Sequence, residues 1–447
     1  MRKNLKKLIL LSCAVGTIFT TLPTATYANT TVTNYIVNAD NYQLPYNGTK
    51  QDFANGINPG YGSGLSLKSI NPDGSIEFYC LTDRGPNGDI PTYIQNGQKY
   101  AGKFFPTPNF TPSIGILKIS NNHAEIINNI PLKDKNNQKI SGKIIPFGNV
   151  GSTGELALDF TMKNLGTDNN GLDTEGIVRD KDGNFWLCDE YGPFLIKTNS
   201  TGKILEKYGP GMGLPDILAQ RVPNRGFEGV TIDDQGNIIG IMQSPLDVDG
   251  KTSKTASYTR IVKLNSQTKE VTMYAYPVDT GYKNFSKAKL GDITFIGNNQ
   301  YLIIEQGKQN GKMQNLIYKV DLNNATAING TSDLEYNKLP NDFKPAQKEL
   351  IIDLRKNGWN IEKAEGLALL PDRQTIAVVN DNDFGIAIKV NDSTNPKASV
   401  EDYTYNADTK EFSNKDNKVV NITIGLQKNA PEEQQSQIYL FKLDHKI

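Results

Sequence analysis

Short apolar segments recur along the chain, and turn-forming residues separate many of them. In residues 171–193, "GLDTEGIVRDKDGNFWLCDEYGP", the apolar run "GIV" is followed by the turn "DKDG" and then by a second run, "FWLC". Two apolar runs joined by a Gly-containing turn predict a β-hairpin. Helical periodicity is scarce, and residues 345–356 are the only stretch that suggests a helix.

The same hairpin plan is found in five places. Each copy begins with a small or acidic residue, continues through an apolar strand and a turn, and ends with a second apolar strand and a polar cluster. The copies are residues 63–88, 171–193, 228–244, 292–307 and 365–383. Repetition of one supersecondary unit along a chain is typical of solenoids and propellers.

Further apolar strands follow most of the copies. They are residues 113–120, 124–130, 194–199, 202–209, 259–265, 270–277, 315–322 and 349–354. Four strands in each long and unequal unit predict the blades of a β-propeller. We therefore expect an all-β fold, a β-propeller of six blades, of which five can be read and one is hidden within residues 133–170. Residues 437–443 would close the ring by pairing with residues 34–40.

The first residues have the pattern of an export signal. The basic segment "MRKNLKK" precedes the apolar run "LILLSCAVGTIFTTL", and "TYA" is an acceptable cleavage site after Ala28. Cys13 within that run resembles the acceptor of a lipoprotein box, but the apolar run before it is short. We predict a signal peptide at 1–28 and one propeller domain at 29–447, secreted or extracytoplasmic. No later stretch is long and apolar enough to span a membrane.

The balance of charged residues limits the classes of molecule that the protein could bind. The 447 residues include 48 basic and 48 acidic side chains, and this zero net charge argues against a nucleic-acid binder. We expect a monomer that acts on a small molecule. Beyond the predicted leader the chain has two cysteines, Cys80 and Cys188, which an exported protein could join in a disulfide or keep as buried thiols.

Acidic residues occupy the same places in several hairpins. In a propeller the innermost strands line a central channel, so acids at first-strand starts and second-strand ends converge at one mouth. Crowded carboxylates do not all stay ionised without cations, and Ca²⁺ takes six to eight oxygen ligands. We predict calcium ligands among Asp173, Glu175, Asp189, Asp292, Glu305, Glu365 and Asp381, and a catalytic acid-base role for Glu190 and Glu228. The alternative is that each acid caps a strand end.

Histidine and nucleophile motifs give little support to other chemistries. His123 and His445 are the only histidines, and neither lies in a repeat, which disfavours zinc. The chain has no G-x-S-x-G motif of a serine hydrolase. Basic residues stand close to the acids, and we predict that Arg84, Arg225 and Lys363 bind an anionic substrate, unless each forms an ion pair with its neighbouring acid.

Four motifs together resemble a known family. They are "SGLSL…LTDRGPNG", "DTEGIVRDKDGNFWLCDEYGP", "RGFEGVTID" and "KAEGLALLPD". They are similar to the secreted phytase-like proteins that are described as having esterase-like activity, and the resemblance covers roughly residues 55–445. It implies a β-propeller and phosphoester hydrolysis. In propeller phytases, carboxylates on the channel hold calcium ions that bind phosphate and activate water.

The sequence therefore predicts a calcium-dependent hydrolase of phosphoesters or related esters, acting by metal-assisted water attack at the mouth of the channel. Two alternatives remain open. One is a propeller that binds a ligand without catalysis, and the other is a calcium-dependent lactonase or arylesterase that uses the same acids.

Overall fold

The computed structural model describes residues 30–46 and 53–447, so the predicted signal peptide lies outside the described residues. Within these ranges the chain forms thirty β-strands and eight short 3-10 turns, and no α-helix. The all-β prediction is confirmed. Residues 345–356, which suggest a helix in the sequence, contain the strand β22 (Gln347–Asp353) instead. Nor does any helix in the two ranges have the length and apolarity needed to cross a membrane.

Five four-stranded antiparallel units form the body of the molecule. The first unit consists of β2 (Gly64–Ile70), β3 (Ile76–Leu81), β7 (Ser113–Ser120) and β8 (His123–Pro131). The second has β10 (Thr174–Arg179), β11 (Phe185–Asp189), β12 (Phe194–Thr198) and β13 (Ile204–Pro210), and the third has β15 (Phe227–Ile232), β16 (Ile238–Met242), β17 (Tyr258–Leu264) and β18 (Val271–Pro277). The fourth has β19 (Lys289–Gly297), β20 (Gln300–Gln309), β21 (Lys312–Asp321) and β22, and the fifth has β23 (Gly366–Leu369), β24 (Thr375–Val379), β30 (Gln437–Lys442) and β1 (Thr31–Asn38).

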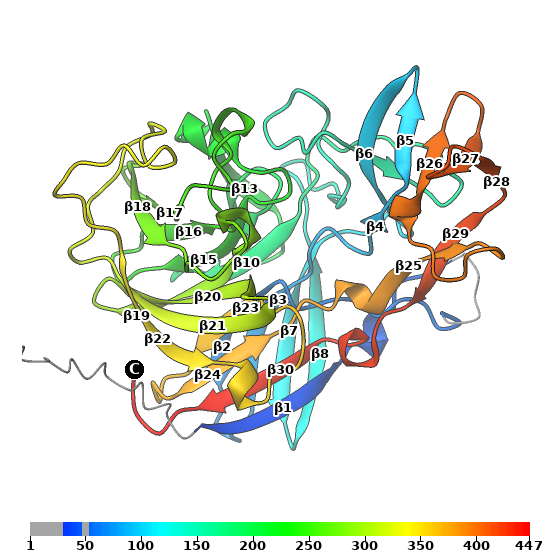
Figure 1. Cartoon of the computed structure of the whole chain (residues 1–447). Coiled ribbons are helices and arrows are strands. Elements are labelled where there is room, and N and C mark those ends of the chain that lie inside the picture. Colours follow the sequence, from blue (N-terminus) through cyan, green and yellow to red (C-terminus); the bar gives the residue numbers. More distant parts are fainter. Residues whose placement is uncertain (1–29, 47–52) are drawn as a thin grey trace, which may run out of the picture.

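The first strands of the five units form a closed ring. β2 contacts β10, β10 contacts β15, β15 contacts β19, β19 contacts β23, and β23 returns to β2. Figure 1 shows β10, β15 and β23 of this ring near the middle of the molecule. β1 pairs antiparallel with β30, which confirms the predicted partnership between the two ends of the chain. β1 also pairs in parallel with β8, so it joins the fifth unit to the first.

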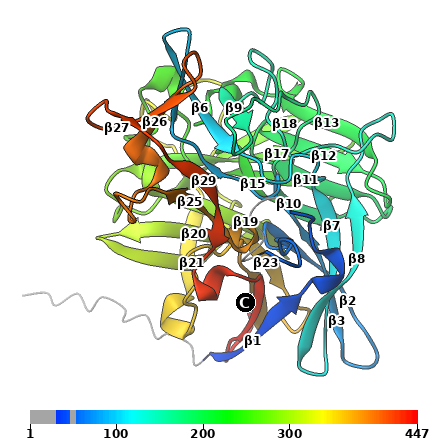
Figure 2. The same ribbon diagram turned by 90° about the vertical axis from the view of Figure 1, so that its right-hand side faces the viewer.

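A side lobe stands next to the ring and is built from two excursions of the chain (Figures 1 and 2). The first excursion follows β3, the second follows β24, and parallel pairing of β5 with β26 joins them. Their strands are β4 (Gly88–Asp89), β5 (Thr92–Gln95), β6 (Gln98–Phe104), β25 (Ile386–Asn391), β26 (Tyr403–Asn406), β27 (Glu411–Asn414), β28 (Val419–Val420) and β29 (Thr423–Lys428). Residues 133–170, where the sequence predicts a sixth blade, contribute β9 (Glu155–Leu158), which pairs with β6 of the lobe.

Apolar side chains fill the spaces between neighbouring units. Ile241 of the third unit, for example, packs in one cluster with Ile293 and Ile303 of the fourth, and all three are buried. Cys80 and Cys188 are buried free thiols in β3 and β11. The remaining elements are β14 (Gly213–Leu214), which pairs with β13, and the turns η1 (Asp40–Tyr42), η2 (Asp216–Gln220), η3 (Val248–Gly250), η4 (Phe285–Lys287), η5 (Arg355–Asn357), η6 (Asp383–Gly385), η7 (Val400–Asp402) and η8 (Pro431–Glu433).

Candidate functional site

A polar cavity of about 230 Å³ lies where first strands begin and second strands end. All its lining residues carry a charged or an amide side chain. They are Asp83, Arg84, Asn87, Lys103, Asp173, Glu175, Glu190, Asn224, Glu228, Gln243, Lys289, Lys363, Glu365, Asp381 and Asp383. The predicted convergence of acids from different repeats is therefore present for Asp173, Glu175, Glu190, Glu228, Glu365 and Asp381.

Strand register explains why these residues meet. In four units the first strand carries a glycine at the same level of the ring: Gly64, Gly176, Gly229 and Gly366. A Cβ atom on Gly176 would lie 2.8 Å from the backbone nitrogen of Val230, so the neighbouring strands approach backbone to backbone. The residue before each glycine then faces the same space. In the second, third and fifth units that residue is a glutamate, which is the physical meaning of the repeated "EG".

The carboxylates form two triads that share one member. One triad is Asp173, Glu175 and Glu190, and the other is Glu175, Glu228 and Glu365. Within each triad, one oxygen from every residue lies within 4.8 Å of the others. All five side chains are buried, and at both Glu175 and Glu228 the strand pairing shifts by a β-bulge. A bulge redirects a side chain from the sheet face, as is common beside functional sites.

Burial and mutual repulsion raise the pKa values of the four glutamates of the triads. Desolvation, reinforced by Asp173, raises the pKa of Glu190 to about 8. Desolvation raises the pKa of Glu365 to about 7, although Lys363 opposes the shift. The pKa values of Glu175 and Glu228 are also well above the ordinary value, first through burial and then through neighbouring carboxylates. The cluster therefore favours bound protons, or bound cations, over bare charge.

Two buried carboxylate oxygens favour a bound cation as the partner of the cluster. Oε2 of Glu228 and Oδ2 of Asp173 accept no hydrogen bond, although Nε of Arg84 lies 3.4 Å from the latter. Buried acceptors are almost always paired, so unpaired ones call for a partner. The available donor atoms are oxygens, which suit a hard cation such as Ca²⁺ and not a metal that prefers nitrogen or sulfur. The triads could therefore hold a metal ion.

Family comparison agrees with the motifs. The family model of phytase-like proteins, described as "Esterase-like activity of phytase", matches residues 62–384. This chain belongs to that family.

Other similarities to the phytase-like chain are more distant. An "Uncharacterized secreted protein" of Arthroderma benhamiae is 28% identical over 240 residues, which is 44% of this chain and 46% of that protein. The match thus spans less than half of either protein. Among solved structures, a streptogramin B lyase has a TM-score of 0.31 at 13% identity, covering 78% of this chain and 94% of its own. A GH62 arabinofuranosidase of Coprinopsis cinerea has a TM-score of 0.38 at 8% identity, covering 94% and 98%. These TM-scores are too low for any statement on shared function.

Basic side chains of the phytase-like site lie along the edge of the acidic cluster. Arg84 contacts Asp173, and its guanidinium donates to Oδ1 of Asn224 at 3.3 Å. Nζ of Lys363 donates to Asp381 at 2.6 Å and to Asp383 at 2.7 Å. Burial alone would lower the pKa of Lys363, but these two carboxylates raise it well above the ordinary value. Arg84 and Lys363, two of the three predicted substrate-binding residues, therefore line the cavity as firmly held cations.

Two predicted calcium ligands lie outside the cavity and bind backbone groups. Asp189 accepts the backbone N–H of Asp173 at 2.7 Å and that of Gly192 at 2.8 Å. Asp292 occupies the level of the ring where the other four units have glycine. Its carboxylate accepts the N–H groups of Leu65 at 3.3 Å, Leu367 at 3.0 Å and Ile293 at 2.8 Å. For Asp189 and Asp292 these contacts agree with the alternative that the acid caps a strand end instead of binding calcium.

Two further predicted residues also point elsewhere. Glu305 accepts the hydroxyl of Tyr276 and the ammonium of Lys348, each at 2.7 Å. Arg225 donates to the carbonyl of Ser286 and does not line the cavity. Glu305 corresponds in register to Asp189, one residue before the strand-end position of Glu190. Because side chains alternate along an extended chain, that single step turns both away from the cavity.

Sequence reasoning missed several lining residues. Gln243 takes the strand-end position of Glu190 in the third unit, and its Nε2 donates to Glu190 Oε1 at 3.1 Å. Lys289 stands two residues before the glutamate level of its unit, as Lys363 does, so the repeat contains a signal for both. Lys103 and Asn87 belong to the side lobe, and no repeated pattern marks them.

Proposed function

We propose that this phytase-like protein is an exported, calcium-dependent hydrolase of small phosphoesters. The observation that carries the proposal is the chemistry of the cavity wall, which consists of charged and amide side chains alone. An acyl chain, an aryl ring or a lactone ring would find no apolar surface there. A phosphoryl group, with several anionic oxygens, matches bound cations and basic side chains. This favours a phosphoester over a carboxyl ester or a lactone.

Calcium would be held by the carboxylates that the two triads bring together. Asp173, Glu175 and Glu365 are the main candidates, because Glu190 and Glu228 are also candidates for proton transfer. Asp381 is less suited to the role because Lys363 already binds it. When bound, the ion would neutralise charge on the phosphoryl oxygens as the reaction proceeds.

The protein's own side chains would position the substrate and the water. Arg84 and Lys363 line the cavity and would bind phosphoryl oxygens. Lys289 also lines the cavity and would be the third basic residue that binds the substrate, in place of Arg225. Glu228 is our preferred general base because its buried Oε2 accepts no hydrogen bond and is therefore available to a water molecule. A general base must lie within hydrogen-bond reach of the proton it accepts.

A substrate panel tests the proposal. The purified protein would be assayed with a phosphomonoester, a phosphodiester, a carboxyl ester and a lactone, each in calcium and in excess chelator. We expect cleavage of a phosphoester that is lost in chelator and restored by calcium. Cleavage of the carboxyl ester or the lactone alone would replace the proposed substrate class. If calcium binds and no compound is cleaved, the protein is a ligand-binding propeller.

The proposal also covers the number of blades, the location of the protein and its partners. We infer a propeller of five blades instead of six, supported by the closed ring of five first strands. Export is supported by the leader-like residues 1–28 and by the Arthroderma relative that is named as secreted. We also propose a monomer that acts on a small molecule, and the zero net charge argues against a nucleic-acid partner.

A further inference from the structure

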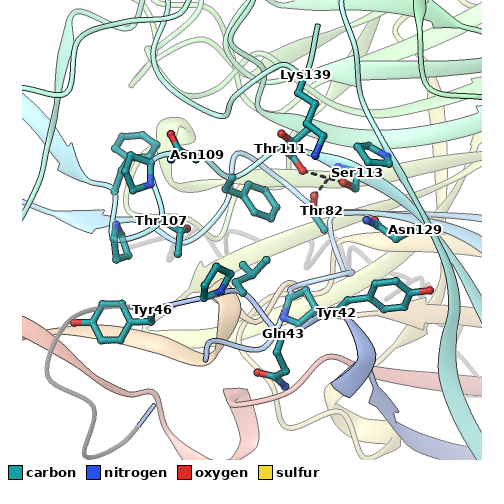
Figure 3. A pocket seen from close by; sticks show the side chains of 18 of the residues that line it. Tyr42, Gln43, Tyr46, Thr82, Thr107, Asn109, Thr111, Ser113, Asn129 and Lys139 are labelled. Atoms are coloured by element: carbon teal, nitrogen blue, oxygen red, sulfur yellow. Dashed lines mark hydrogen bonds between the residues drawn. The ribbon is translucent and has the colours of Figure 1, made fainter. Parts of the chain in front are cut away.

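A second and larger cavity, of about 600 Å³, lies over the first unit. Thr82 follows the end of β3, Ser113 begins β7 and Pro131 ends β8, so the cavity lies at the end of the unit where Asp83 and Arg84 also stand. Figure 3 shows its two facing walls, with Tyr42, Gln43 and Tyr46 on one side and Thr107, Asn109 and Thr111 on the other. A volume of this size is typical of sites for drug-sized organic ligands.

The wall of this cavity is the chemical opposite of the acidic site. Six aromatic side chains and five prolines contribute to it, among them Phe105, Phe110, Phe160 and Tyr46. Phe105 and Tyr46 are buried, and the other two are half-buried. Stacked aromatic and proline surfaces bind apolar bodies well and leave orientation to a few polar groups.

The charged groups of the lining decide which ligand fits. Only Lys139 and Asp159 carry charge. Asp159 is engaged in its own turn, where Oδ1 accepts the backbone N–H groups of Thr161 at 2.8 Å and Lys163 at 3.1 Å. Lys139 is exposed and has no ion pair within residues 30–46 and 53–447, and Figure 3 shows it reaching toward Thr111 and Ser113. The Asp159 carboxylate keeps its charge but is held by backbone N–H groups of its own turn, and among the described residues no carboxylate pairs with Lys139. The cavity therefore offers one free ammonium group beside an apolar wall.

We propose that this cavity binds an amphipathic organic anion, with its aromatic or aliphatic body against Phe105, Phe110, Phe160 and Tyr46 and its anionic head at Lys139. The oxygen Oγ1 of Thr107, buried without a hydrogen-bond partner, is a further polar group for the ligand. A neutral oligosaccharide would also stack on aromatic rings, but it would leave Lys139 without a counter-charge.

The two cavities are separated by a packed wall. A Cβ atom on Gly85 would lie 2.3 Å from the ring of Phe110, so the chain beside Arg84 rests directly on that ring. Phe110 also meets Phe384 edge to face, with centroids 5.3 Å apart, and Phe384 follows Asp383 of the acidic site. Occupation of the apolar cavity does not require calcium or catalysis, so this proposal and the proposed hydrolase activity can fail separately.

Two matched probes test the inference: anilinonaphthalene sulfonate, an aromatic anion that fluoresces when bound, and N-phenylnaphthylamine, the same ring system without the sulfonate. We expect saturable one-site binding of the sulfonate to the native protein. Lys139→Gln should weaken sulfonate binding about five- to tenfold and leave the neutral probe unchanged. Lys135→Gln, at an exposed lysine outside the cavity, is the matched control.

A filling variant checks the location without removing a packed ring. Thr111→Trp should reduce the affinity for both probes at least tenfold while thermal unfolding remains cooperative. Sulfonate binding that neither Lys139→Gln nor Thr111→Trp alters would overturn the proposal. Equal affinity for the two probes would show an apolar site without anion selectivity. Displacement of the sulfonate by a neutral hexasaccharide, but not by an alkyl sulfonate, would replace the anion with a carbohydrate.

Discussion

At the scale of single residues, Glu175 is the side chain in which the two triads meet. It is buried, and its carboxylate feels the charges of Asp173, Glu190, Glu228 and Glu365. Such a residue lowers the stability of the cation-free protein, because ionising it costs both desolvation and repulsion. Its retention is easier to explain by ligand binding than by stability.

We predict that Glu175→Gln weakens calcium binding and lowers hydrolytic activity by roughly 100-fold or more, since one ligand of each triad is lost. The same change should leave the melting temperature in chelator unchanged or higher. Calorimetric titration with calcium and thermal unfolding measure the two effects. Asp182→Asn, an exposed acid at the turn of the same hairpin, is the control and should change neither. Full calcium affinity in Glu175→Gln would remove Glu175 from the site.

At the scale of elements, the ring of first strands is fastened by one carboxylate. Four units have glycine at the central level, and the open space receives the side chain of Asp292 from β19. Its hydrogen bonds reach β2 and β23, which belong to different units. The fourth unit thus has a structural aspartate and no site glutamate, because its sequence reads "GD" where the second, third and fifth units read "EG".

We predict that Asp292→Asn lowers the free energy of unfolding by about 3 kcal/mol, because an amide has one acceptor oxygen for three backbone N–H groups. Denaturant unfolding would measure the loss. Asp234→Asn, at an exposed turn of the neighbouring third unit, should cost less than about 0.5 kcal/mol. A similar small effect for both variants would mean that Asp292 does not fasten the ring.

These elements also mark how far the sequence could predict the structure. The hairpins can be predicted from the sequence because apolar runs and turn residues are local signals. The repeated "EG" predicts that Glu175, Glu228 and Glu365 lie together. The side lobe could not be predicted, because Thr92 pairs with Thr404 across more than 300 residues and no local pattern in the sequence marks that pairing. Asp292 and Glu305 each stand one residue away from the level of a site residue, and that one-residue step decides the direction of a side chain.

At the scale of the whole molecule, the acidic cluster links stability to pH. In the cation-free protein the folded state retains protons on Glu190 up to about pH 8 and on Glu365 up to about pH 7, whereas an unfolded glutamate releases its proton near pH 4.3. The folded state then binds more protons than the unfolded state between these values. The free energy of unfolding must therefore fall as the pH rises through this window.

We predict that the melting temperature in chelator decreases from about pH 5 to pH 8. Calcium at about 100 times its Kd at pH 8 should raise the melting temperature by roughly 3 °C at pH 8, and the same concentration should raise it by less at pH 5, where protons compete for the same oxygens. Thermal scans at both pH values, with magnesium as a comparison cation, measure the difference. A calcium effect that is equal at pH 5 and pH 8, or none at millimolar calcium, would argue against a cation in this cluster.

The joining of β1 to both β30 and β8 has a consequence for the order of events during synthesis. The first triad belongs to a single hairpin, so its three acids require only residues 171–193 to be in their native pairing. The second triad needs Glu365, and the fifth unit that carries it is completed only by β30 near the end of the chain and β1 near its beginning. The second triad can therefore be completed only after residues 437–442 have been synthesised, whereas every acid of the first triad is already present in the first 193 residues.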